Sequence, residues 1–301
     1  MVNTMKNKLS TKNTFRQTTL IGYAFIAPAV ILMAIFLVYP IVEALRLSLY
    51  NSTLKETTFV GLDNFVKLFH DDLFLKCLSN TIKYVVIIVP VVVLLSLYVA
   101  SIISKKKPWK TSMYRGLFYL PTIASAVTVS VVWNWIFNPV IGVANYLIGE
   151  MGGKPVMWFS GSETAFYCVV LVSVVCSVGQ PIILYSAAIG GISSEYYEAA
   201  ALDGASDWQQ FVRITIPMLK PTTLYILVIT SINAFQIFIP VQMLTGGGPV
   251  NSTTSLIYEL YRTAFQYRNF GYASAMGVIL FIILGILAML QFRLMNDDKG
   301  G

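Results

Sequence analysis

Residues 83–104 read KYVVIIVPVVVLLSLYVASIIS, and this stretch decides the fold class of the chain. After the lysine at its start it contains no charged side chain. An α-helix of about 20 apolar residues crosses the roughly 30 Å hydrocarbon core of a bilayer, and one charge near the bilayer centre costs roughly 2.5–3.5 kcal/mol. The stretch therefore predicts a membrane-spanning helix.

Five further apolar runs have a similar length, at residues 20–41, 114–137, 165–190, 222–244 and 272–292. The composition agrees, because 56% of the residues are hydrophobic and only 12% are charged, whereas a soluble domain carries roughly 25% charged residues. We therefore predict an all-α integral membrane protein with about six transmembrane helices. Prolines within or beside five of these runs predict kinked helices.

Basic residues set the orientation of the spans, because cytoplasmic loops carry an excess of Lys and Arg. The segment before the first span holds four basic residues and no acid, and residues 105–115 hold five and no acid. Both termini and the second and fourth loops are predicted to be cytoplasmic, and the other loops face outward. The first run is too long for a signal peptide and no cleavage site follows it, so we expect it to be retained.

This topology divides the chain into four parts. We expect a cytoplasmic segment at residues 1–19, a first transmembrane helix with its outer loop at 20–80, a membrane core with the remaining spans at 81–295 and a cytoplasmic tail at 296–301. The net charge of +7 follows the cytoplasmic loops rather than a polar face, so no nucleic-acid partner is expected. Three cysteines without CxxC spacing and the lone His70 give no metal cluster and no disulfide framework.

The fourth loop breaks the charge rule, because acids outnumber basic residues in it. It reads SEYYEAAALDGA at 194–205 and then DWQQFVRI at 207–214. Ser194 is placed to cap a short helix, and Gly204 permits the left-handed conformation that ends one. A second short helix would expose Trp208 and Phe211. Such a hairpin suits docking of a soluble partner, although a connector lying on the bilayer surface would also fit the pattern.

The spacing in this loop resembles a known motif. Glu198-Ala199-Ala200 is followed at fixed intervals by Gly204, Ile214 and Ile216-Pro217. This resembles the EAA motif of binding-protein-dependent ABC importer permeases, with Ile216 where the pattern usually has Leu. The match lies in the cytoplasmic loop before the penultimate span, where the motif is found in that family.

Other segments resemble the carbohydrate-uptake branch of the same family, in the "first permease" form of the maltose and glycerol-phosphate type. The resemblance covers residues 20–295 and is carried by FVGLDNF at 59–65, YLP at 119–121, WNWIF at 133–137, NAF at 233–235, LTGGGP at 244–249, YRTAF at 261–265 and FGYASA at 270–275. It implies a type I ABC importer transmembrane domain in a bacterial cell membrane.

The resemblance also implies partners. These are a second homologous permease, two ATP-binding subunits that hold ATP and Mg, and an extracytoplasmic solute-binding protein that delivers a carbohydrate. The chain itself would bind no cofactor and no metal, and would not be an enzyme. The residues expected to couple it to an ATPase subunit are Glu198, Ala199, Ala200, Asp203, Gly204, Trp208 and Phe211.

The residues themselves weigh against other classes. The sequence contains no G-x-x-x-x-G-K stretch, and the nearest match, Gly152-Gly153-Lys154, lacks the upstream glycine. We therefore expect no P-loop. The spans lack the Asp, Glu or His that proton coupling uses, and they lack a nucleophile paired with a base. Sodium coupling through backbone carbonyls remains an alternative.

Amide and aromatic side chains in the fifth span are the candidate substrate contacts. They are Asn233, Phe235, Gln236, Phe238 and Gln242. Asn233 and Gln236 are three residues apart and would share a helix face. The alternative is that these amides hold helices together, as Asn and Gln do in membranes. The glycine run at 246–248 is expected to form a flexible outward loop.

Overall fold

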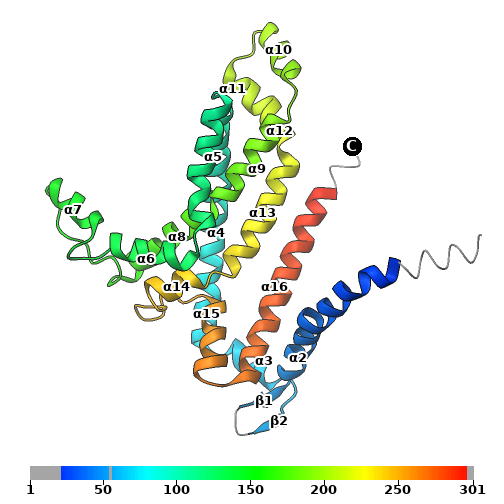
Figure 1. Ribbon diagram of the computed structural model, residues 1–301. Helices are drawn as coiled ribbons and strands as arrows, with labels where there is room; N and C mark the ends of the chain where they lie inside the picture. The colour runs from blue at the N-terminus through cyan, green and yellow to red at the C-terminus, as the bar shows by residue number, and fades with distance from the viewer. Residues whose placement is uncertain (1–21, 54–55, 297–301) are drawn as a thin grey trace, which may run out of the picture.

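The computed structural model describes residues 22–53 and 56–296 of the chain. The predicted cytoplasmic segment 1–19 and the part of the predicted tail after residue 296 lie outside the described residues. The rest forms a helical bundle with one short antiparallel β-hairpin, in which Tyr50 pairs with Phe59 (Figure 1). This confirms the all-α class and adds a small element that the hydropathy pattern does not predict.

The described elements follow one another as η1 (Ala34–Val38), α2 (Tyr39–Leu47), β1 (Tyr50–Ser52), β2 (Thr57–Phe59), α3 (Asp63–Phe69), α4 (Asp72–Ser104), α5 (Pro108–Ile123), α6 (Ala126–Ile136), α7 (Val143–Glu150), α8 (Ser162–Ser177), α9 (Gly179–Gly190), α10 (Ser194–Leu202), α11 (Asp207–Gln210), η2 (Phe211–Thr215), α12 (Ile216–Met218), α13 (Lys220–Phe235), α14 (Ile239–Leu244), α15 (Leu256–Tyr261), η3 (Arg262–Gln266) and α16 (Phe270–Asn296).

Three described helices are long and apolar enough to span a membrane, and three bent pairs of helices bring the number to the predicted six if each pair forms one span. Three are continuous helices, at Gly22–Leu47, Asp72–Ser104 and Phe270–Gln291. Three are pairs of helices joined at a sharp bend: α5 with α6 at 94°, α8 with α9 at 42°, and the segment 207–218 with α13 at 65°. α4 runs through Pro90 as one helix of 33 residues and forms the longest element of the bundle.

The third span differs most from a straight helix. α5 ends at Ile123 and the backbone of Ala124 is extended, at φ −64° and ψ 141°. Ser125 then caps α6, because its side chain accepts a hydrogen bond from the Val127 amide. A new N-cap two residues after Ile123 starts a second helix in a different direction.

The fifth span is shorter than predicted. The run 222–244 was expected to form one helix, but α13 ends at Phe235 and α14 begins at Ile239. Pro240 lies in the first turn of α14, where its missing N–H costs nothing, whereas inside a continuous helix it would leave the carbonyl four residues earlier without a donor. The proline therefore restarts the helix and leaves residues 236–238 irregular.

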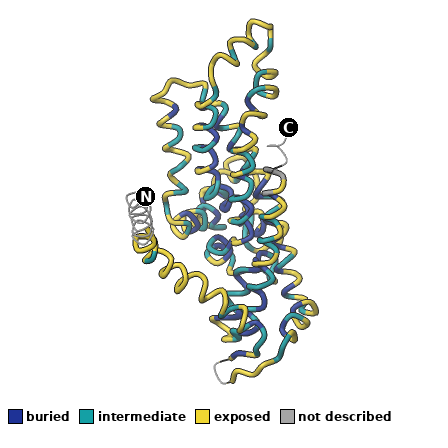
Figure 2. Tube along the Cα trace, turned by 90° about the vertical axis from the view of Figure 1, so that its right-hand side faces the viewer, coloured by how far each residue is buried: buried dark blue, intermediate teal, exposed yellow. Residues whose placement is uncertain are grey.

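The core is built around α4. Tyr84 and Val92 of α4 are fully buried, as are Val169 of α8, Ile182 of α9 and Leu256 of α15. Figure 2 shows this buried strip running along the middle of the bundle, with exposed residues around it. Tyr84 stacks on Phe166, with ring centroids 4.5 Å apart. α4, which also lines the cavity described below, is thus packed against other helices on several sides.

The first span stands apart from the bundle. None of its most apolar window is buried, and Phe25 and Phe36 are 82% and 74% exposed. Only its end, at α2, packs against β1 and α16 (Figures 1 and 2). This contact is close, because Gly271 at the start of α16 lies against the Tyr50 carbonyl oxygen and a Cβ there would overlap it.

Candidate functional site

A cavity of about 290 Å³ lies where the fifth span breaks. Its walls come from α4, α6, α8 and the segment from Asn233 to Pro240. Irregular backbone at membrane depth is tolerated where it lines a cavity, and the three residues between α13 and α14 do so. The volume is close to the lower end of the range for small-molecule sites, roughly 300–1,000 Å³.

Three of the five predicted substrate residues line this cavity: Asn233, Gln236 and Phe238. Asn233 and Gln236 are exposed, and within the described chain neither amide side chain makes a hydrogen bond. Phe238 is half-buried and its ring lies 5.1 Å from that of Tyr261. The cavity therefore presents two unengaged amides beside an aromatic face.

The other two predicted residues lie elsewhere. Phe235 is buried and packs in an apolar cluster with Leu256, and Gln242 is exposed on α14 away from the cavity lining. The expectation that Asn233 and Gln236 share a helix face is wrong, because α13 ends between them. Both reach the cavity from the end of the helix rather than from its side.

A second, smaller cavity of about 20 Å³ continues from the first. Ser177 and Asn233 line both cavities, and Gln180 and Tyr225 line only the smaller one. A polar strip therefore runs along the faces of α9 and α13. Ser177 was not predicted as a site residue, because a serine in an apolar run is common in membrane helices. It lines both cavities because it lies at the bend between α8 and α9.

The predicted hairpin of the fourth loop is present and projects beyond the ends of the neighbouring helices (Figure 1). α10 is capped by Ser193 rather than by the predicted Ser194. Gly204 has the predicted left-handed conformation, at φ +78°. α11 then begins with a capping box, in which the Ser206 and Gln209 side chains each accept a hydrogen bond from the other's backbone N–H.

Apolar side chains are exposed along the hairpin. Leu202 is 90% exposed and Trp208 is 70% exposed, and Phe211 lies beside Trp208 with ring centroids 5.8 Å apart. No residue of α10 is buried, and the exposed Glu198 side chain makes no hydrogen bond or ion pair with the described residues. Exposed aromatic and acidic groups on an ordered projection have the character of a docking surface.

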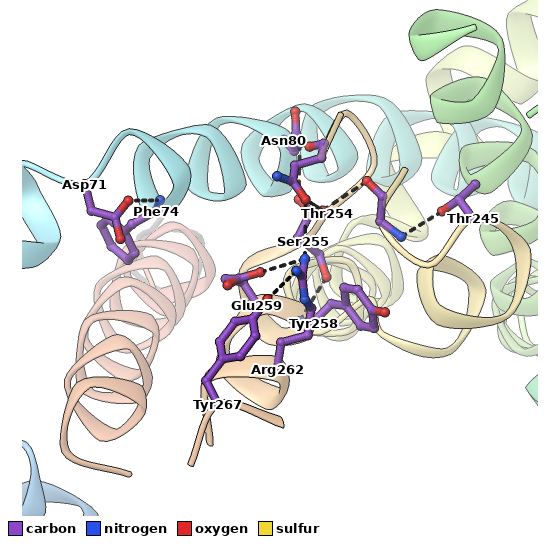
Figure 3. A network of polar contacts seen from close by, with 12 residues as sticks. Asp71, Phe74, Asn80, Thr245, Thr254, Ser255, Tyr258, Glu259, Arg262 and Tyr267 are labelled. Carbon is purple, nitrogen blue, oxygen red and sulfur yellow. Dashed lines mark hydrogen bonds and ion pairs between the residues drawn. The ribbon is translucent and has the colours of Figure 1, made fainter. Parts of the chain in front are cut away.

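The loop at 245–255 is fixed, contrary to the flexibility expected from its glycines. Three side chains one turn apart on α4 donate hydrogen bonds to carbonyl oxygens of the loop. Lys76 donates to Val250 at 2.7 Å, Asn80 to Asn251 at 3.0 Å and Tyr84 to Thr253 at 2.9 Å. Figure 3 shows the part of this network around Asn80 and Thr254. Hydrogen bonds along one face of α4 therefore order the loop.

The same network contains a buried acid. The Glu259 carboxyl is 3.2 Å from the Arg262 guanidinium, and its side chain is only 3% exposed. Burial raises the pKa of Glu259, and the nearby Arg262 charge opposes that shift. Arg262 also donates to Asn251 and to Tyr267, so the pair ties α15 to the loop.

The Asn80→Ala variant is expected to loosen this loop. Asn80 is buried and donates to the carbonyl oxygens of Asn251 and Thr254, and a buried acceptor left without a partner costs about 1–3 kcal/mol. We expect a melting temperature lower by several degrees and faster amide exchange over residues 250–255. Ser79→Ala, which removes an exposed neighbour on the same helix, is the control. Unchanged exchange in Asn80→Ala would show that the loop is held without this side chain.

A multi-span helical chain with a ligand-sized cavity at a broken helix and an ordered hairpin beyond the spans defines a membrane transport subunit. The sequence profile described as "Binding-protein-dependent transport system inner membrane component" matches residues 74–299. The chain belongs to this family. The membership confirms the resemblance carried by the EAA spacing.

Relatives match along nearly the whole chain. The probable ABC transporter permease protein YurN of Bacillus subtilis (strain 168) is 36% identical over 288 residues, which cover 94% of this chain and 98% of the relative. The lactose transport system permease protein LacF of Rhizobium radiobacter is 32% identical, with 92% of this chain and 95% of the relative covered.

Solved structures share the fold. A chain of a bacterial alginate ABC transporter in complex with a periplasmic protein bound to an alginate pentasaccharide superposes with a TM-score of 0.82 at 24% identity, covering 96% of this chain and 98% of that one. A chain of a bacterial ABC transporter involved in alginate import gives 0.79 at 26% identity, with 94% and 98% covered. The chain therefore has the type I ABC importer membrane-domain fold.

Proposed function

We propose that this chain forms half of the translocation pathway of an ATP-driven importer for a carbohydrate. The observation that carries the proposal is the cavity at the end of α13, which Asn233, Gln236 and Phe238 line together and where neither amide has a hydrogen-bond partner among the described residues. Amides can donate and accept hydrogen bonds with sugar hydroxyls, and an aromatic face covers their apolar side. Relatives named for lactose, glycerol-3-phosphate and arabinooligosaccharide transport support the substrate class.

A second, homologous permease supplies the other half of the pathway in this proposal. Asn233 and Gln236 are exposed on this chain, so a second chain is needed to enclose a substrate there. Phe25 and Phe36 of the first span are also exposed, and membrane lipid and the second permease are the partners suited to such a surface.

Two ATP-binding subunits, which hold ATP and Mg, drive transport from the cytoplasmic side. The hairpin of α10 and α11 docks on one of them, with Trp208 and Phe211 as apolar contacts and the Glu198–Gly204 segment as the fixed turn. In this proposal the hairpin end and both termini lie in the cytoplasm of a bacterial cell, in agreement with the basic residues before the first span and in the second loop. The opposite end, with β1 and the loop at 245–255, receives the solute-binding protein.

The first test is affinity purification of the tagged chain from gently solubilised native membranes, followed by reconstitution with whatever co-purifies. Stoichiometric recovery of an ATPase subunit and a second permease, with ATP-dependent uptake of at least one sugar from a labelled panel, is the expected result. Recovery of the chain alone under several mild detergents, with uptake driven by a sodium gradient, would replace the proposal with an ion-driven carrier.

A further inference from the structure

Arg115 makes an unusual contact at the predicted cytoplasmic end of the bundle. It is half-buried on α5, and within the described chain no carboxylate lies within ion-pair distance of it. Its Nε donates to the Ser186 hydroxyl at 2.8 Å, and its Nη2 donates to the Ser186 carbonyl at 3.1 Å. The guanidinium therefore donates two hydrogen bonds to a single residue of α9.

This contact depends on the shape of a guanidinium. Arg presents parallel donors in a planar fork, whereas Lys offers a single point of charge on a flexible stem. Ser186 is fully buried, and it lies four residues before the end of α9 at Gly190. A positive charge near a helix C-terminus is stabilised by the helix dipole. The fork thus fixes the last turn of α9 against α5.

The end of α9 leads directly into the docking hairpin. Only seven residues separate Ser186 from Ser194, where α10 begins. The other arm of the hairpin is also held, because Lys105 lies 2.7 Å from Asp207 at the start of α11. Residues 104–115, which we call the α4–α5 corner, therefore contact the end of α9, which leads into the hairpin, and the start of α11 within it.

The corner is continuous with the rest of the site. Ser104, the last residue of α4, lies 3.5 Å from the Ser186 hydroxyl. The same helix lines the cavity at Ile88 and holds the loop at 245–255 through Asn80 and Tyr84. α4 thus connects the hairpin, the cavity and the opposite face through one rigid element, and coupling between distant sites is carried by packed elements of this kind.

We propose that Arg115 is a positioning residue for energy coupling. Its fork on Ser186 ties the hairpin to the α4–α5 corner, so that movement imposed on the hairpin by an ATPase subunit reaches α4, the cavity and the loop at 245–255. The Lys105–Asp207 pair is exposed on both sides and contributes little, since surface pairs are typically worth about 0–1 kcal/mol. This inference rests on the proposed function.

The test uses the complete reconstituted transporter and needs no knowledge of the sugar. Spin labels are placed at Tyr196→Cys on α10, outside the Glu198–Gly204 segment, and at Val250→Cys on the opposite face, which are 55% and 81% exposed, after replacement of Cys77, Cys168 and Cys176 by alanine. The distance between the labels is measured by pulsed electron resonance before and after trapping with MgATP and vanadate, and ATP hydrolysis is measured in parallel.

In the parent protein, trapping is expected to shift the distance distribution. Arg115→Met should keep ATP hydrolysis within about twofold while losing most of the shift, and Arg115→Lys should show an intermediate shift. Lys106→Met removes the same charge from the same corner, where the exposed Lys106 side chain makes no hydrogen bond or ion pair with the described residues, and it should behave as the parent.

A full shift in Arg115→Met would overturn the inference and leave the proposed function standing. If Arg115→Met fails to assemble, the same distance measurement is made on Ser186→Ala and Arg115→Lys. A full shift of the distance in both variants would also overturn the inference. If the parent recruits no ATPase subunit or shows no shift on trapping, the proposed function fails and the inference fails with it. If Arg115→Met loses ATP hydrolysis and the distance shift to the same extent, the role of Arg115 is structural and the inference is overturned.

Discussion

Gly204→Asp is expected to abolish ATP-dependent uptake while the chain still inserts and assembles in the membrane. Gly204 joins the two arms of the hairpin at φ +78°, a conformation that costs an L-residue roughly 1–2 kcal/mol. A Cβ at this position would meet no atom of the chain within 4 Å. The substitution therefore leaves the packing of the bundle intact and acts on the hairpin alone.

The larger part of the effect comes from the new charge. In the proposed complex this turn lies against an ATPase subunit, and an unpaired carboxylate buried in an interface is strongly unfavourable. Each 1.4 kcal/mol lowers an equilibrium constant by a factor of ten, so we expect uptake at least about 100-fold below the parent. The measurement is uptake of the labelled sugar that the parent transports, with membrane content followed by immunoblotting.

Gly152→Asp is the matched control. Gly152 also has a positive φ, at +77°, and open space around it, but it lies in the third loop, away from the hairpin. It should transport normally. Normal uptake by Gly204→Asp, with the same membrane content, would instead remove the hairpin from the coupling pathway and return it to a surface connector.

The fold was predictable where the sequence carries a local physical signal. A charge-free run such as 84–104 has no stable alternative to a span, and Gly204 marks a turn because few other residues adopt its conformation. The bends were not predictable in detail. Pro90 leaves α4 continuous, whereas Ser125 and Pro240 each begin a new helix, and the choice between these outcomes depends on neighbouring helices that the local sequence does not specify.

The residues of the candidate site were likewise predictable only where the local sequence carries a signal. Asn233 and Gln236 stood out because amides are rare and costly among apolar residues. Arg115 could be seen as a basic residue at the end of a span, but its partner Ser186 lies 71 positions away. The expected flexibility of the glycine-rich loop was wrong for a similar reason, because Asn80 and Tyr84, which order it, are more than 160 positions away.

Asn233→Ala combined with Gln236→Ala is expected to weaken transport without altering the basal ATP hydrolysis of the complex. Each amide lines the cavity and has no protein partner in the described chain, so its removal leaves no buried group unsatisfied. A lost hydrogen bond to a neutral group costs about 0.5–1.5 kcal/mol, which is roughly a 2- to 10-fold loss per residue. The double variant should raise the sugar concentration for half-maximal uptake by about 4- to 100-fold.

Gln266→Ala provides the comparison, since Gln266 is an exposed amide with no side-chain contact in the described chain and lies away from the cavity. Its concentration dependence should match that of the parent. The alternative role, in which the two amides hold helices together, predicts a different pattern: lower melting temperature, lower ATP hydrolysis and an unchanged half-maximal concentration. Neither amide donates or accepts a hydrogen bond with a neighbouring helix among the described residues. A fall in stability would therefore have to come from a lost contact with the second permease, and co-purification of that subunit would then decrease in parallel.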